Sequence, residues 1–238
     1  MALAQPRPLA IAADAKGVLS TDRFAAELRG FGPAGLAAIL VIALGNALFV
    51  PLTALLVLAW AWRSGTPWRA IGLSRPRSWP ATILIGLAFG AAFKLVMKAL
   101  VMPLLGAPPI NPAYHYLAGN TAALPGALYL ILVGAGFGEE VFFRGFLFER
   151  FGQLLGASRP AKAATVSVTA LWFGLDHLRV QGIAGMEQAL IVGLVFGGVY
   201  AATGRLWLLI VAHAAFDLTA LAIIYWDVEA EAAAYVFG

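Results

Sequence analysis

Three short stretches in the second half of the chain place ionisable side chains inside apolar segments. They are Glu139–Arg144, Phe173–His177 and His213–Asp217. Ionisable side chains within a bilayer are costly, so those that occur there usually serve a function. Carboxylates and imidazoles are the groups that activate water and stabilise developing charge in hydrolysis. The residue types therefore predict a hydrolytic site.

The first stretch contains two adjacent glutamates in different settings. Glu140 and Arg144 are four residues apart, so on a helix they share a face and can form an ion pair. Glu139 is rotated by about 100° from Glu140, and the residue four positions further on is Phe143. We expect Glu139 to point into a cavity and act as a general base. The alternative is that both glutamates only pair with arginines at a membrane interface.

The other two stretches supply histidines. His213 and Asp217 are four apart, so the aspartate can orient the imidazole, or both can hold one ligand, water or oxyanion. A lone histidine such as His177 is more often a core residue. Two histidines with carboxylates on separate helices of a bundle favour a shared site instead. We expect Glu139, His177, His213 and Asp217 to meet around one water, and we expect the remaining histidine, His115, to be solvated.

Two mechanisms fit this set of side chains. Without a metal, Glu139 and His177 deprotonate water, while His213 and Asp217 stabilise the oxyanion. In that role Asp217 must be protonated or must act by orienting His213. With zinc, the same four residues would be the ligands. We favour the reaction without a cofactor. The chain has no cysteine, no His-Glu-x-x-His and no Gly-x-Ser-x-Gly, which argues against thiol, zincin-type and serine peptidases.

The elements that must position these residues are membrane helices. The chain is 61% hydrophobic and 12% charged with a mean hydropathy of +0.85, whereas about 25% charge is usual in soluble domains. Its apolar runs are long enough to span a bilayer. We predict an all-α, polytopic membrane helical bundle with about six transmembrane helices. The expected spans are 35–62 (kinked at Pro51), 80–102, 122–150, 163–178, 186–202 and 206–226.

The charge distribution fits a membrane protein and not a nucleic-acid binder, because the basic residues cluster at the ends of apolar runs. We predict a partly interfacial N-terminal extension (1–34), a transmembrane domain (35–226) and an acidic tail (227–238). The basic loops are expected in the cytoplasm. Strict alternation then puts the N-terminus outside, although it carries Arg7, Lys16, Arg23 and Arg29. Either the rule fails there, or an extra re-entrant or interfacial segment lies near 22–29.

The three motifs together resemble the CPBP family of intramembrane peptidases, which includes type II CAAX prenyl endopeptidases and bacteriocin-immunity proteins. The family pattern is Glu-Glu-x-x-x-Arg, Phe-x-x-x-His and His-x-x-x-Asn or Asp, in that order. Trp68–Leu73 also resembles the entry to the family's core, which would cover about 68–226.

The resemblance implies a helical bundle that cleaves a peptide bond in or near the bilayer. It implies catalytic roles for Glu139, His177, His213 and Asp217 and supporting roles for Glu140, Arg144 and Phe173. The third motif ends in Asp217 and not in Asn, which leaves a metal role more open.

The leading hypothesis is therefore an intramembrane endopeptidase of the glutamic type, acting on a membrane-associated protein or peptide and surrounded by membrane lipid. We expect a multi-pass protein of the bacterial inner membrane. One alternative is a non-catalytic scaffold or immunity protein of the same fold, and another is a zinc-dependent peptidase. An ion-coupled transporter would also use intramembrane Glu, Asp and His. Transporters usually show internal repeats, and the sequence shows none.

Overall fold

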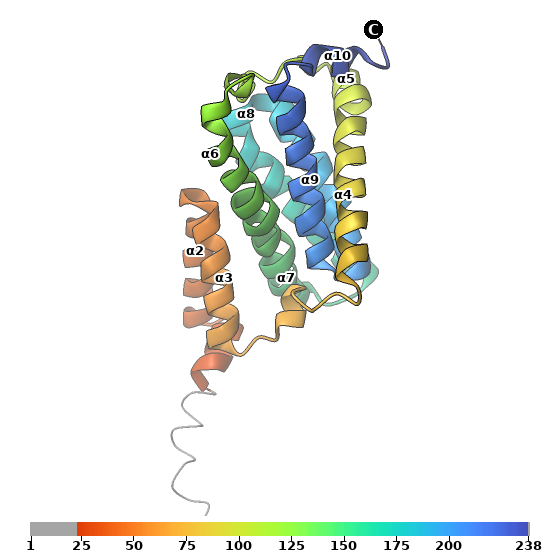
Figure 1. Ribbon diagram of the computed structural model, residues 1–238. Coiled ribbons are helices and arrows are strands. Elements are labelled where there is room, and N and C mark those ends of the chain that lie inside the picture. The colour runs from red at the N-terminus through yellow and green to blue at the C-terminus, as the bar shows by residue number, and fades with distance from the viewer. Residues whose placement is uncertain (1–22, 238) are drawn as a thin grey trace, which may run out of the picture.

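Long apolar helices make up most of the molecule. The computed structural model describes residues 23–237, which are largely helical and contain no strand within that range (Figure 1). The principal helices are α2 (Pro33–Leu48), α3 (Val50–Ser64), α4 (Trp79–Val96), η2 (Met97–Val101), α5 (Met102–Leu104), α6 (Leu124–Tyr129), η5 (Leu130–Glu139), η6 (Val141–Phe146), α7 (Leu147–Leu155), α8 (Arg159–Thr203), α9 (Leu206–Tyr225) and α10 (Glu229–Ala234). The predicted all-α helical bundle is confirmed.

The first apolar run is two short helices and not one kinked span, so the expectation for 35–62 was wrong. Phe49 adopts an extended conformation between α2 and α3. The two helices lie side by side (Figure 1), and an ideal Cβ on Gly45 would lie only 3.2 Å from Thr53 Oγ1. At 1.5 Å per residue, helices of 16 and 15 residues are about 24 Å and 23 Å long, shorter than a bilayer core of about 30 Å. They form a short hairpin.

This hairpin brings the start of the described chain to the same end of the molecule as the basic loops. The Trp60 indole donates to Leu28 O at 3.1 Å, Arg29 donates to Ser64 O, and Arg150 donates to Arg29 O at 2.7 Å. A helix over Arg23–Arg29, bent by 55° from α2, therefore lies at the same end as the basic loops. For Arg23 and Arg29 the conflict in the predicted topology disappears, because the chain reverses at Phe49. Arg7 and Lys16 lie outside the described residues.

Among the described residues, four helices are long and apolar enough to cross a membrane: Trp79–Leu104, Thr121–Leu155, Arg159–Thr203 and Leu206–Tyr225. Arg159–Thr203 folds back at Gly182, whose φ of 67° and ψ of −164° are not helical. Gly174 packs against Met186 and Leu190, and Gly193 packs against Ala170. The two limbs are therefore antiparallel and correspond to the predicted runs 163–178 and 186–202. The predicted count of six spans is therefore approximate: the first predicted span is the short α2–α3 hairpin, and the fourth and fifth are the two limbs of α8.

Glycines let α4 lie directly against α9. An ideal Cβ on Gly90 would be 2.0 Å from Ala212 O, and one on Gly86 would be 2.7 Å from a Val211 methyl carbon. Neither position has room for a larger side chain. This contact fixes the register of the two helices and sets Lys94 of α4 beside Phe216 of α9.

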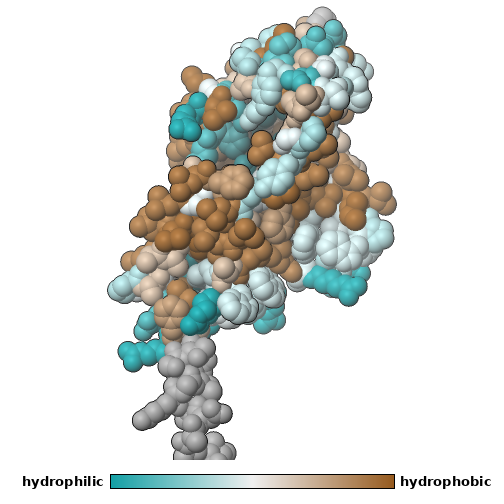
Figure 2. Space-filling view, turned by 60° about the vertical axis from the view of Figure 1, so that its left-hand side comes forward, coloured by the Kyte–Doolittle hydropathy of each residue, from teal (hydrophilic) through white to brown (hydrophobic). Residues whose placement is uncertain are grey.

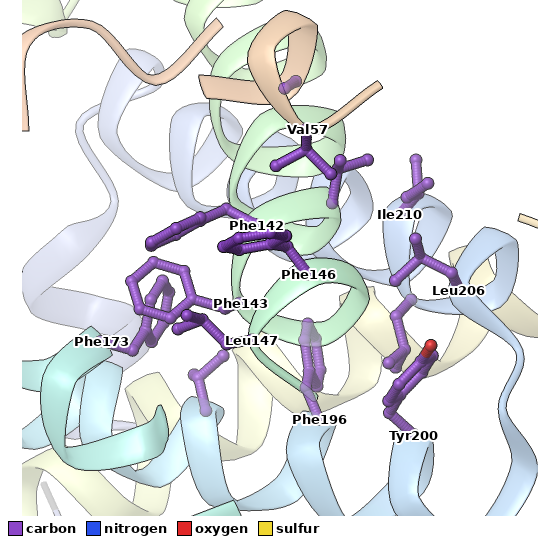
Figure 3. Packing of buried hydrophobic residues seen from close by; sticks show 14 of the residues in the cluster. Val57, Phe142, Phe143, Phe146, Leu147, Phe173, Phe196, Tyr200, Leu206 and Ile210 are labelled. Carbon is purple, nitrogen blue, oxygen red and sulfur yellow. The ribbon is translucent and has the colours of Figure 1, made fainter. Parts of the chain in front are cut away.

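An aromatic core lies next to the charged motifs. Phe142, Phe143 and Phe146 of η6 pack with Phe173 of α8 and with Phe196, and all five side chains are buried (Figure 3). Many large apolar side chains remain exposed on the outer faces of the helices. Figure 2 shows them across the middle of one face, with hydrophilic residues gathered toward its two ends. This surface suits lipid, and the protein is an integral membrane protein.

Candidate active site

A single large cavity contains the predicted site residues. Its volume is about 740 Å³, and Glu139, His177, His213 and Asp217 all line it. Its other walls come from the junction of α2 and α3, from α4, and from the loop between α5 and α6. The side chains therefore share a space large enough for a peptide segment, although they come from three separate stretches of sequence.

Glu139 ends the π-helical segment η5, next to the tip of the α2–α3 hairpin. An ideal Cβ on the preceding Gly138 would lie 2.8 Å from a Val50 methyl carbon, so the hairpin tip packs directly beside it. Oε2 of Glu139 is buried and makes no hydrogen bond within residues 23–237. It lies 3.7 Å from His213 Nε2. Glu139 thus lines the cavity with one carboxylate oxygen that has an ion-pair contact but no hydrogen bond to the described residues.

Glu140 binds two cationic or donor groups at once. Its Oε1 accepts from Arg144 Nη1 at 2.9 Å and pairs with His213 Nδ1 at 2.7 Å. All three side chains are buried. The predicted ion pair between Glu140 and Arg144 is present. The bond to His213 was not predicted, because nothing in the sequence places residue 140 opposite residue 213.

Asp217 therefore does not hold the imidazole in the way its spacing suggested. Its Oδ2 lies 3.7 Å from His213 Nε2, while Glu140 makes the short bond to Nδ1. His213 is oriented from behind by Glu140 and presents Nε2 to the cavity, with Glu139 and Asp217 on either side of it. Glu140, which the sequence had assigned only a supporting role, thus makes the shortest contact with His213.

His177 is held by its own helix. Its Nδ1 lies 2.8 Å from Phe173 O, and because a carbonyl oxygen only accepts, Nδ1 carries the proton. Nε2 of the neutral ring is then an acceptor on the cavity side. His177 and Glu139 line the same cavity, and no nitrogen–oxygen pair of the two side chains lies within 4.0 Å, so there is room for a water or a substrate group between them.

Phe173 connects the charged groups through its ring. The ring centroid lies 4.8 Å from Arg144 Cζ and 4.7 Å from the His177 ring. A guanidinium over an aromatic face is stabilised where water is excluded. Phe173 therefore helps to hold Arg144 buried, which in turn neutralises Glu140.

Tyr114 is a cavity residue that the sequence did not reveal. It lies in the loop between α5 and α6, and its hydroxyl accepts a hydrogen bond from Gln181 Nε2 at 3.2 Å. Burial raises the pKa of Tyr114 above its ordinary value, and the charges of Asp217 and Glu139 act in the same direction. The phenol therefore keeps its proton and can donate a hydrogen bond into the cavity. A tyrosine in a polar loop carries no distinguishing signal in one sequence.

The side chains as arranged do not fit a metal centre. Within residues 23–237, no three His, Asp or Glu side chains converge with the geometry needed to hold an ion. The four ligands named for a zinc site, Glu139, His177, His213 and Asp217, share the cavity but do not form a ligand shell.

Comparison with known families agrees with the motifs. Residues 121–219 match the family described as Type II CAAX prenyl endopeptidase Rce1-like. The match contains all three motifs and confirms the family resemblance inferred from them. It does not extend to Trp68–Leu73. No curated protein and no solved structure gave a significant match. The match points to a peptidase and to a membrane-associated protein as substrate.

Proposed function

Because residues 121–219 carry the motifs of the Rce1-like peptidases, we propose that the protein is an intramembrane endopeptidase of the glutamic type. It would hydrolyse a peptide bond of a membrane-associated protein or peptide. The observation that carries the proposal is the buried Oε2 of Glu139, which makes no hydrogen bond to the described residues and lies 3.7 Å from His213 Nε2 inside a cavity of about 740 Å³.

The proposed reaction starts with water held between Glu139 and His177. The Glu139 carboxylate accepts a proton from the water, and the oxygen adds to the carbonyl carbon of the scissile bond. Nε2 of His177 accepts the second hydrogen bond of that water, because its Nδ1 is bound to Phe173 O. The proton on Glu139 then passes to the leaving amine nitrogen as the C–N bond breaks.

The oxyanion formed in this step needs a donor. His213 provides one when its Nε2 is protonated, since Glu140 holds the ring by Nδ1 at 2.7 Å and aims Nε2 into the cavity. Asp217 flanks the same nitrogen at 3.7 Å and would donate to the oxyanion only when protonated. Preorganised donors of this kind typically contribute about 10²- to 10³-fold to the rate.

Glu139→Gln tests the proposal directly. The amide keeps the shape of the side chain but cannot accept a proton, so turnover should fall by about 10²- to 10⁴-fold. Membrane peptides from cells that make the wild-type protein or the variant should then differ in the cleaved products. Glu231→Gln, an exposed change on α10, is the matched control and should leave the products unchanged.

The competing functions predict different results. A scaffold or immunity protein of the same fold would retain its cellular effect in Glu139→Gln, and that result would reject the peptidase. A zinc peptidase would copurify with stoichiometric zinc and lose turnover to chelators. We expect neither zinc nor sensitivity to chelators, and the opposite finding would replace the glutamic mechanism.

A further inference from the structure

One cation in the cavity has no part in the mechanism above. Lys94 lies in the apolar helix α4, is only 8% exposed, and lines the same cavity as Glu139 and Asp217. A lysine in this position is costly for a membrane helix unless something compensates its charge. Gly90, one helical turn before Lys94, packs directly against Ala212, and this contact fixes the position of Lys94 along the helix.

The protein itself satisfies Lys94 only in part. Nζ donates to Gln188 Oε1 at 3.1 Å and lies 4.8 Å from the centroid of the Phe216 ring. Within residues 23–237, no carboxylate lies within 4 Å of Nζ. An ammonium group has three N–H donors, and one of them is used by Gln188.

Gln188 adds further donors at the same place. Its Oε1 accepts from Lys94, and its amide nitrogen has no hydrogen-bond partner among the described residues. Gln188 also lines the cavity. Together the two side chains offer several N–H donors, while the one nearby amide oxygen is already occupied. A donor-rich, positively charged pair of this kind suits a carboxylate.

Lys98 lies one turn further along, and in contrast to Lys94 its charge is paired within the protein. Its Nζ lies 3.5 Å from Glu229 Oε1 and donates to Pro109 O. Lys98 therefore connects the outer loop to α10. Both lysines line the cavity, but only Lys94 keeps its charge available to a ligand.

We propose that Lys94 and Gln188 form a subsite that binds a carboxylate of the substrate. This inference rests on the proposed peptidase function and adds a specificity element to it. The carboxylate would be the C-terminus of a peptide or an Asp or Glu side chain. Because the Glu139 carboxylate repels negative charge, a carboxylate bound at Lys94 orients the peptide so that an uncharged segment reaches Glu139.

The test measures binding, so that it stays separate from cleavage. The full-length Glu139→Gln protein in lipid nanodiscs is titrated with three fluorescent apolar octapeptides. One ends in a free carboxylate, one in an amide, and one in an amide with a single internal Asp. We expect a carboxylate-bearing peptide to bind at least tenfold more tightly than the plain amide. Preference for the first or the third peptide identifies the source of the carboxylate.

Adding Lys94→Met should remove this preference, and Lys94→Arg should preserve it. Lys98→Met is the matched control and should keep the preference. Gln188→Leu, which keeps the lysine but removes its amide acceptor, should weaken the preference severalfold and provides a second test if Lys94→Met fails to fold. Equal binding of all three peptides would overturn the subsite. So would a preference that persists in both Lys94→Met and Gln188→Leu. If the wild-type protein cleaves no peptide but the carboxylate preference is found, the peptidase function is rejected and the carboxylate subsite stands.

Discussion

Two charged clusters line the same cavity and use the same residue types in opposite ways. The outer cluster is centred on Glu229 of α10, whose two oxygens bind Asn111 N at 2.9 Å, His115 Nδ1 at 3.1 Å and Lys98 Nζ at 3.5 Å. The inner cluster contains Glu139, Glu140, Arg144, His213 and Asp217. There, Oε2 of both glutamates is buried without a hydrogen bond to the described residues.

The difference separates a structural cluster from a chemical one. Glu229 is 2% exposed and bonds through both oxygens, so it ties the outer loop and η2 to α10 and has no oxygen left for chemistry. It also places His115, expected to be solvated, in a hydrogen bond. In the inner cluster, Oε1 of Glu140 accepts from both Arg144 and His213, while Oε2 of Glu139 has only a 3.7 Å contact with His213 Nε2 and no hydrogen bond to the described residues. Incomplete pairing at a buried position indicates a site that meets its ligand there.

Breaking the inner cluster at Glu140 should have the largest effect on stability. Glu140→Gln removes the anion that neutralises Arg144 and orients His213, and it leaves a buried charge uncompensated. We expect the free energy of unfolding to fall by about 3 to 5 kcal/mol. Thermal unfolding of the purified protein in detergent would measure the change. If Glu140→Gln is as stable as the wild type, the ion pair of Glu140 and Arg144 does not stabilise the site.

Changing Asp217 should affect turnover more than stability, because its carboxylate is 28% exposed and lies at the edge of the inner cluster. Asp217→Asn can still donate a hydrogen bond to an oxyanion and should keep turnover within about tenfold of the wild type. Asp217→Leu cannot donate, and it should lose about 10²-fold or more. Turnover numbers on one cleaved peptide would compare the two. Equal activity of the Asn and Leu variants would remove Asp217 from the reaction.

Breaking the outer cluster should have the smallest effect. Glu229→Gln keeps an acceptor for Asn111 N but loses the charge that holds Lys98 and His115. We expect a loss of about 1 to 2 kcal/mol in unfolding free energy. Hydrogen exchange in residues 107–120 should increase, while the intrinsic chemistry stays intact. If Glu229→Gln instead abolished turnover without faster exchange, the outer cluster would have to be counted as part of the chemistry.

The helices of the second half could be predicted from the sequence because hydropathy records burial in lipid directly. The ion pair of Glu140 and Arg144 was predictable for a similar reason, since helical spacing alone brings the two side chains together. The reversal at Phe49 was not predictable in this way. A continuous apolar run looks the same whether it crosses the bilayer once or turns back within it, and Pro51 suggested only a kink.

By itself, the sequence determined that the chain lies in a membrane and that Glu139, His177, His213 and Asp217 are the residues to examine. Composition and local periodicity carry that information. Only the tertiary structure decided that Glu140 holds His213, that the hairpin tip closes on Gly138, and that Lys94 faces the cavity while Lys98 is paired. These contacts join residues far apart in the chain. They depend on how helices pack against each other, which the spacing within one helix does not specify.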